Sequence, residues 1–272
     1  MRMKFWSSRA IRSAGFQALG WCAYAVIPVL FPSEAFSSEA ILDGAVVFAL
    51  GLFMALRINR AYERWWEART LWGALVNASR NLAVKIRIFV RLPADDSIDV
   101  GRLIAGFAFG LRDHLRGRAI LADLKGFGSD DGDPRHVPGF IALRLYERIR
   151  DWERSERING DEMRTLDIEA RVLLEVAGAC ERIRNTPLPR ALTWATRLAL
   201  AGFLLAMPWL AREELGWLVV PLVGVGAFFI LLSETIADAL EHPFGTELNQ
   251  LDLTAICVEI EKSTRELLEA PS

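Results

Sequence analysis

The side chains best suited to catalysis or metal binding are spread thinly along this chain of 272 residues. Its three histidines, His114, His136 and His242, are isolated and lack the close spacing with which histidines on one helix bind a metal. The sequence contains no Ser-His-Asp or Cys-His arrangement, no phosphate-binding loop and no GxGxxG motif. We therefore expect no enzyme, no metal and no other cofactor.

The cysteines also argue against chemistry. Cys22, Cys180 and Cys257 lie far apart, form no CxxC pair and are odd in number, which is typical of reduced or buried thiols rather than of a disulfide framework. Cys180 is followed by Glu181, but we interpret it as a packing residue rather than a nucleophile.

A denser group of polar residues lies in the segment that begins at residue 57. Arg57 and Arg60 can raise the local concentration of anions, but Glu63 and Glu67 alternate with them, so the sign of the field stays open. Three apolar residues precede this group at intervals of four and share one face of a helix: Phe48, Leu52 and Leu56. On a membrane helix, such a stripe faces lipid or a neighbouring helix more often than a pore.

Composition indicates how these residues are positioned. Hydrophobic residues make up 52% of the chain and the mean hydropathy is +0.23, yet 24% of the residues are charged. Both values are possible only if apolar and charged residues are segregated along the chain. The net charge of -2 argues against a dedicated nucleic-acid-binding protein.

Four apolar segments predict four membrane-spanning helices, at about 13–33, 40–58, 191–211 and 215–235. The second and third segments are weaker, because their uncharged cores alone are too short to cross roughly 30 Å of hydrocarbon, and buried core helices are an alternative for both. A signal peptide is an alternative for the first segment, although its length and the next span close behind it argue against this.

The distribution of basic residues predicts the orientation. Arginines and lysines precede the first span and follow the second, whereas the loop between these spans contains Glu34 and Glu39 but no basic residue. The positive-inside rule places the N-terminus in the cytoplasm, and an even number of spans places the C-terminus there too. The basic residues concerned are Arg2, Lys4, Arg9, Arg12, Arg57, Arg60, Arg64 and Arg69.

The remaining residues, about 59–190 and 236–272, predict a cytoplasmic helical part. No proline occurs between Leu52 and Val84, so one helix is expected to continue from the membrane into this part. A loop rich in Gly, Asp and Pro is expected at 126–139. The C-terminal residues predict an amphipathic helix with a partial apolar face of Leu248, Leu251, Ile256, Ile260 and Leu267.

Three segments carry a family resemblance. Residues 57–83 read RINRAYERWWEARTLWGALVNASRNLA, residues 180–189 read CERIRNTPLP, and residues 242–245 read HPFG. Together they resemble the bestrophin family in its bacterial branch, over nearly the whole chain.

The resemblance implies an all-α homopentameric ion channel with four membrane helices per subunit and a cytoplasmic helical vestibule. The second helix of each subunit would line one central pore, with an apolar neck that the family register places at Phe48, Leu52 and Leu56. We expect Arg57, Asn59 and Arg60 at the inner pore mouth. A second constriction, at the cytoplasmic exit, is expected near Met163, with Leu166 as the second choice.

The expected function is passive conduction of small monovalent ions, chloride or other anions, across the bacterial inner membrane. A sodium or potassium channel is the first alternative, and a non-conducting scaffold or a transporter is the second. Membrane lipid, the permeant ions and other copies of the chain are the expected partners, without nucleic acid. Eukaryotic bestrophins bind calcium through an acidic run after PFG. The corresponding stretch here, PFGTELNQLDL, contains only Glu247 and Asp252, which predicts no activation by calcium.

Overall fold

The computed structural model places the central and terminal helices of the chain but not all of its connections. The first two predicted spans extend into residues 32–33 and 40–43, which lie outside the described residues, as do Arg2, Lys4, Glu34, Glu39, Glu247 and Leu248. The described residues are 9–31, 44–90, 92–128, 132–187, 189–246 and 250–269.

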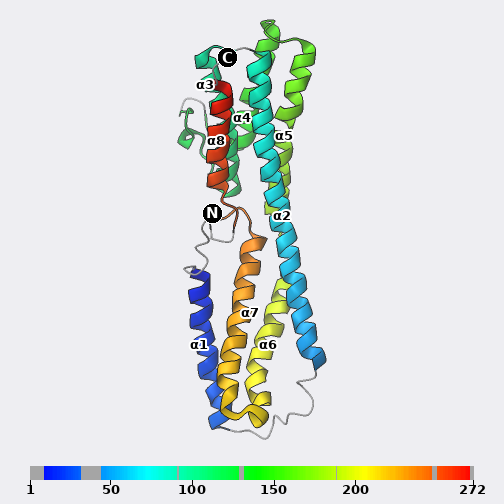
Figure 1. Cartoon of the computed structure of the whole chain (residues 1–272), viewed down its shortest axis with the longest axis vertical. Helices are drawn as coiled ribbons and strands as arrows, with labels where there is room; N and C mark the ends of the chain where they lie inside the picture. Colours follow the sequence, from blue (N-terminus) through cyan, green and yellow to red (C-terminus); the bar gives the residue numbers. More distant parts are fainter. Residues whose placement is uncertain are drawn as a thin grey trace. The chain divides into compact units, whose positions relative to one another are not determined.

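The secondary structure of the described residues is entirely helical (Figure 1), which confirms the predicted all-α class. The 3₁₀ helices η3 (Leu121–Asp123) and η5 (Gly216–Leu218) lie in the connections. The α-helices are α1 (Arg9–Leu30), α2 (Gly44–Phe89), α3 (Ala94–Leu115), α4 (Val137–Arg154), α5 (Gly160–Asn185), α6 (Arg190–Leu215), α7 (Val219–Glu241) and α8 (Leu253–Glu269).

The chain divides into two compact units, and α2 contributes to both. The first unit contains α1, α2 up to Trp65, α6 and α7; the second contains the rest of α2, α3, α4, α5 and α8. The expected unbroken helix is confirmed, because α2 runs from Gly44 to Phe89 without a proline to interrupt it.

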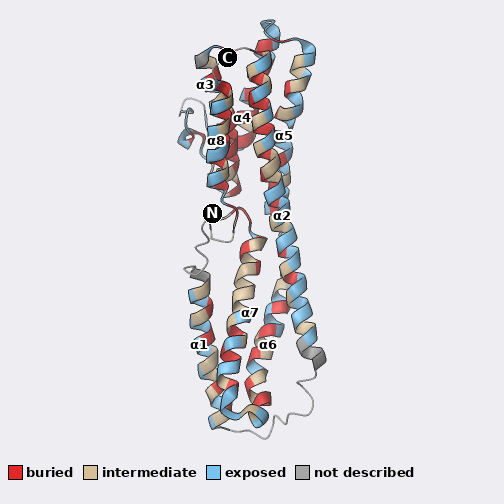
Figure 2. Ribbon diagram, in the orientation of Figure 1, coloured by how far each residue is buried: buried red, intermediate tan, exposed pale blue. Residues whose placement is uncertain are grey.

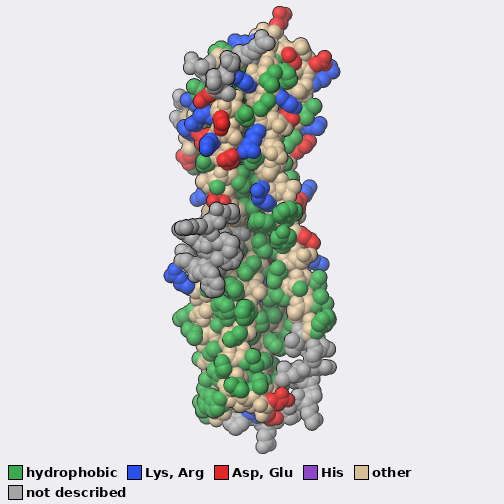
Figure 3. All heavy atoms as spheres, in the orientation of Figure 1, with side chains coloured by type: hydrophobic (Ala, Val, Ile, Leu, Met, Phe, Trp, Pro, Cys, Tyr) green, Lys and Arg blue, Asp and Glu red, His purple; other side chains and the backbone are tan. Residues whose placement is uncertain are grey.

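Small residues let the helices of the first unit approach closely. Ala25 of α1 packs against Val219 and Val223 of α7 and Ala211 of α6. Large apolar side chains point outward from the same helices, and they cover the surface of this unit in Figure 3. In the described residues, two helical stretches are long and apolar enough to cross a membrane, Ile11–Leu30 and Thr193–Glu241.

A tight turn separates α6 from α7. Gly216 ends α6 with a φ of 52°, a left-handed conformation that favours glycine. Only Gly216–Leu218 intervenes before α7. The turn therefore falls a few residues later than the predicted boundary between residues 211 and 215.

The second unit has an ordinary buried core (Figure 2), with α8 packed along α3 of the same chain (Figure 1). Of the apolar face predicted for the C-terminal helix, Ile260 is buried in this contact, and Leu251 is buried just before α8. Charged residues gather on the surface of this unit (Figure 3). Its fully buried large side chains include Trp72, Leu75, Phe107, Leu111, Ile141, Leu145 and Ile149.

Side-chain caps fix the starts of α4 and α5 in the second unit. Asn159 and Glu162 form a capping box at the start of α5. His136 caps α4, because its Nδ1 accepts a hydrogen bond of 2.9 Å from the N–H of Gly139. The predicted loop at 126–139 therefore ends at a histidine with a defined orientation; residues 129–131 of that loop lie outside the described residues.

Candidate ion pathway

The three predicted neck residues lie on an uncovered face of α2. Phe48, Leu52 and Leu56 are 72%, 50% and 48% exposed. Among residues 48–65 of this helix, Arg57 and Ala61 are the buried ones. Since a helix turns about 100° per residue, the stripe centred on Leu52 points about 140° away from Arg57. The stripe thus faces away from the helices of its own subunit.

Arg57 lies in a group of four charges that we call the charge clamp: Arg57, Arg197, Glu234 and Asp238. Its side chain is 2% exposed and forms ion pairs with Glu234 and, at 2.6 Å, with Asp238 of α7. Arg197 of α6 pairs with the same two carboxylates, Nε lying 3.2 Å from Glu234 Oε2. Two cations and two anions thus join α2, α6 and α7, and the charge of Arg57 is neutralised within the subunit.

The other two predicted mouth residues are exposed. The Asn59 side chain donates a hydrogen bond of 2.9 Å to Glu63. Arg60 forms no ion pair with any described residue. By the same helical geometry, Asn59 and Glu63 lie within about 20° of Leu52, whereas Arg60 lies about 80° from it. Asn59 and Glu63 therefore continue the line of the apolar stripe along the helix more closely than Arg60 does.

Several side chains that follow Arg60 on α2 hold this helix in place by packing and hydrogen bonding. Arg64 Nε donates a hydrogen bond of 2.8 Å to the carbonyl of Glu241, the last residue of α7. Tyr62 stacks on Trp65, with ring centroids 6.1 Å apart. Trp72 is fully buried in the second unit. These contacts fix the helix and offer no reactive group.

The structure corrects one choice for the cytoplasmic constriction. Leu166 is fully buried in the core of the second unit, so its side chain cannot line a passage. Met163 is half-buried. Ile168, two residues after Leu166, is 52% exposed. The helical phase of α5 decides which residues of this segment face outward, and counting along the sequence cannot determine that phase.

The structure also corrects the view of the histidines as isolated. His114 near the end of α3 and His136 at the start of α4 both contact Glu181 of α5. Their Nε2 atoms lie 2.8 and 2.6 Å from the same carboxylate oxygen, Oε1, and their rings are 4.7 Å apart. Burial and the neighbouring His136 lower the pKa of His114, and Glu181 opposes this. No short-range spacing could have revealed a group assembled from three helices.

The PFG segment is held by a cation of the protein itself. Arg116, which follows α3, donates hydrogen bonds of 3.3 and 3.1 Å to the carbonyls of Phe244 and Gly245. Asp252 accepts the N–H of Ala255 and caps α8. These oxygens therefore accept hydrogen bonds from donors of the protein itself.

Two of the cysteine thiols, Cys180 and Cys257, are unreactive because they are buried. Burial raises the pKa of Cys180 to about 12, and the carboxylates of Glu67 and Glu181 add to the effect. Burial likewise raises the pKa of Cys257 to about 12. A thiol needs its thiolate form to act as a nucleophile, so neither can do so near neutral pH.

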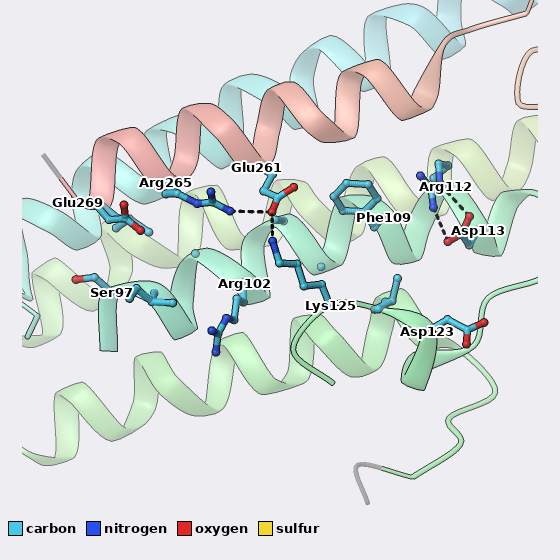
Figure 4. A pocket seen from close by; sticks show the side chains of 16 residues that line it. Ser97, Arg102, Phe109, Arg112, Asp113, Asp123, Lys125, Glu261, Arg265 and Glu269 are labelled. Atoms are coloured by element: carbon cyan, nitrogen blue, oxygen red, sulfur yellow. Dashed lines mark hydrogen bonds and ion pairs between the residues drawn. The ribbon is translucent and has the colours of Figure 1, made fainter. Parts of the chain in front are cut away.

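A pocket of about 580 Å³ lies beside α3 and α8 (Figure 4). Lys125 and Arg265 both point to Glu261 Oε1, at 3.1 and 2.9 Å, and Arg112 pairs with Asp113. The charged residues that line the pocket balance, with four cations and four anions: Arg102, Arg112, Lys125 and Arg265 against Asp113, Asp123, Glu261 and Glu269.

Comparison with known proteins agrees with the resemblance. Residues 11–266 match the family model of the bacterial/fungal bestrophin protein. A voltage-dependent anion channel-forming protein of Synechocystis is 27% identical, over 98% of this chain and 90% of its own. A protein of the same description from Mesorhizobium japonicum is 32% identical, over 84% and 75%.

A solved structure of similar fold is the bacterial bestrophin homologue of Klebsiella pneumoniae. It matches with a TM-score of 0.87 and 22% identity, over 94% of this chain and 99% of that one. The family match covers most of the chain, and the helices superpose on a member of that family. The chain belongs to the bacterial/fungal bestrophin family of membrane proteins, and it is not an enzyme.

Proposed function

We propose that this chain assembles as a homopentamer and conducts small anions passively through a pore on the five-fold axis. The observation that carries the proposal is the apolar stripe of Phe48, Leu52 and Leu56, which is exposed and turned away from the subunit's own helices. A soluble protein would cover such a stripe. Five copies facing one axis would form an apolar neck, which can gate by dewetting.

We further propose four membrane spans, at about 13–33, 40–58, 191–211 and 215–235, in the bacterial inner membrane with both termini cytoplasmic. The apolar stretches Ile11–Leu30 and Thr193–Glu241 support the first, third and fourth of them. The second relies on the apolar start of α2, and the basic residues that follow it support the orientation.

At the inner mouth we assign Asn59 and Arg60 to the ion path, and Arg57 to the charge clamp rather than to the path. At the cytoplasmic exit, Met163 and the exposed Ile168 are the apolar candidates for a constriction. The names of the Synechocystis and Mesorhizobium relatives, both anion channel-forming proteins, support anions as the permeant species.

A cation channel is the second candidate, and one observation favours it. Glu63 continues the apolar stripe more closely than Arg60 does, so a ring of five carboxylates would lie just inside the neck. Rings of acidic side chains select cations, whereas rings of basic side chains select anions.

The reversal potential of the purified protein in a planar bilayer under a KCl gradient distinguishes the two candidates. A value near the chloride equilibrium potential, moved toward zero by Arg60→Gln, supports the anion channel. A value near the potassium potential, moved toward zero by Glu63→Gln, supports the cation channel. Absence of current under all voltages would favour a scaffold.

The neck is tested by the triple substitution of Phe48, Leu52 and Leu56 to Ala. We expect a wider pore with a higher single-channel conductance or a longer open time. Phe53→Ala is the matched control, because Phe53 is 52% exposed on the same helix but lies about 100° from Leu52. Equal currents in the wild type and the triple variant would refute the neck assignment.

A further inference from the structure

We propose that His114, His136 and Glu181 form a binding site for a divalent transition-metal ion, of which Zn²⁺ is the best match. The three residues come from α3, the start of α4 and α5, and their ligand atoms all lie within 4.8 Å of one another. Two of the three histidines of the chain meet at one carboxylate. None of these three residues is among those proposed for the ion pathway.

The geometry is close to what zinc requires. Zinc–ligand bonds of about 2.0–2.2 Å in a tetrahedron place ligand atoms about 3.3 Å apart. The two nitrogen–oxygen distances, 2.8 and 2.6 Å, need to widen by about 0.5–0.7 Å to admit the ion. The side chains are 21%, 46% and 28% exposed, so the ion can enter from solvent and a water molecule can fill the fourth position.

The donor set selects the class of metal. Two imidazoles and one carboxylate suit zinc and similar transition metals, whereas calcium and magnesium prefer six or more oxygen ligands or several waters. Arg184 donates a hydrogen bond of 2.8 Å to the carbonyl of His114, so a positive charge already lies beside the site and opposes purely electrostatic binding of a cation. Affinity must therefore come from the imidazole nitrogens, which favours zinc over calcium further.

Metal binding would change one hydrogen bond in a defined way. In the structure, His136 Nδ1 accepts from the Gly139 N–H, so the ring proton is on Nε2 and points to Glu181. To bind zinc through Nε2, His136 moves this proton to its own Nδ1, so this ring releases no proton. Nδ1 of His136 then no longer accepts from Gly139, so zinc competes with the cap of α4.

The test is titration of the purified full-length protein with Zn²⁺ by calorimetry, alongside His114→Ala, His136→Ala and Glu181→Gln. We expect one zinc per subunit, with affinity at least about 10-fold weaker in each variant. His242→Ala is the matched control, because His242 lies in the other unit, and it should bind like the wild type. Unchanged affinity in the three variants, or an equal loss in the control, would overturn the site.

A second measurement uses the wild type and so does not depend on the variants folding. Hydrogen exchange of the peptide containing Gly139 should be faster with Zn²⁺ than without it, because its N–H loses an acceptor. Co²⁺ should give the visible absorption of a four-coordinate site, and Ca²⁺ should produce neither effect. Unchanged exchange with Zn²⁺ would exclude ligation by Nε2 of His136.

Discussion

The Glu234→Gln substitution should destabilise the protein far more than a surface substitution of the same kind. It leaves the charge clamp with two arginines and one aspartate, and Arg57, which is 2% exposed, cannot recover hydration. Removing one partner of a buried pair costs about 3–5 kcal/mol. Because Arg57 keeps Asp238 at 2.6 Å, we expect the lower end of that range, about 3 kcal/mol.

Scanning fluorimetry of the detergent-purified protein measures the effect. At about 2–4 °C per kcal/mol for a chain of this size class, the loss corresponds to a midpoint lower by about 6–12 °C. Glu214→Gln is the control, since Glu214 is exposed near the end of α6 and pairs with no described residue. Its midpoint should stay within about 2 °C of the wild type.

The double variant Arg57→Met/Glu234→Gln tests the physical reason. It removes one cation and one anion together, so the remaining pair, Arg197 and Asp238, is neutral again. Since the unpaired buried charge causes most of the loss, the double variant should be more stable than Glu234→Gln alone. A double variant that is less stable than the single one, or a single variant that matches the Glu214→Gln control, would refute this reasoning.

Two further predictions concern packing and thiol chemistry. Gly224→Ala should lower the thermal midpoint by the equivalent of about 1–3 kcal/mol, because the added methyl group would collide with the sulfur of Cys22 on α1. Adding Cys22→Ala to the same chain should restore most of the lost stability. Additive losses from the two substitutions would contradict the contact. Burial raises the pKa of both Cys180 and Cys257 to about 12, so N-ethylmaleimide at pH 8 should leave them unmodified in the native protein and label them after denaturation. Mass spectrometry measures the labelling. Rapid labelling of either cysteine in the native protein would contradict its burial.

The helices could be predicted because their signals are local. The absence of proline after Leu52 predicted the long α2. In α4, Leu145, Ile149 and Trp152 lie at helical spacing in the sequence, and all three are buried. The spacing of four was enough to predict that Phe48, Leu52 and Leu56 share one face of α2. Their assignment to the neck came from the family register.

The missed features depend on tertiary contacts. Arg57 meets Asp238 across 181 residues, and His136 meets Glu181 across 45. Nothing near Arg57 in the sequence indicates that its charge is neutralised, so the sequence suggested a role in the ion path. Likewise, the burial of Leu166 and the exposure of Ile168 depend on which face of α5 packs inward. A count of residues along the sequence cannot determine that face.

The short turn at Gly216–Leu218 has a consequence for how the protein is made. With so few residues between them, α6 and α7 would enter the membrane as one hairpin in the proposed four-span topology. Arg197, near the start of α6, and Glu234 and Asp238, near the end of α7, meet at the open end of that hairpin. In that topology the hairpin would supply Glu234 and Asp238 as counter-charges for its own Arg197 during insertion, and the same two carboxylates would receive Arg57 when α2 docks.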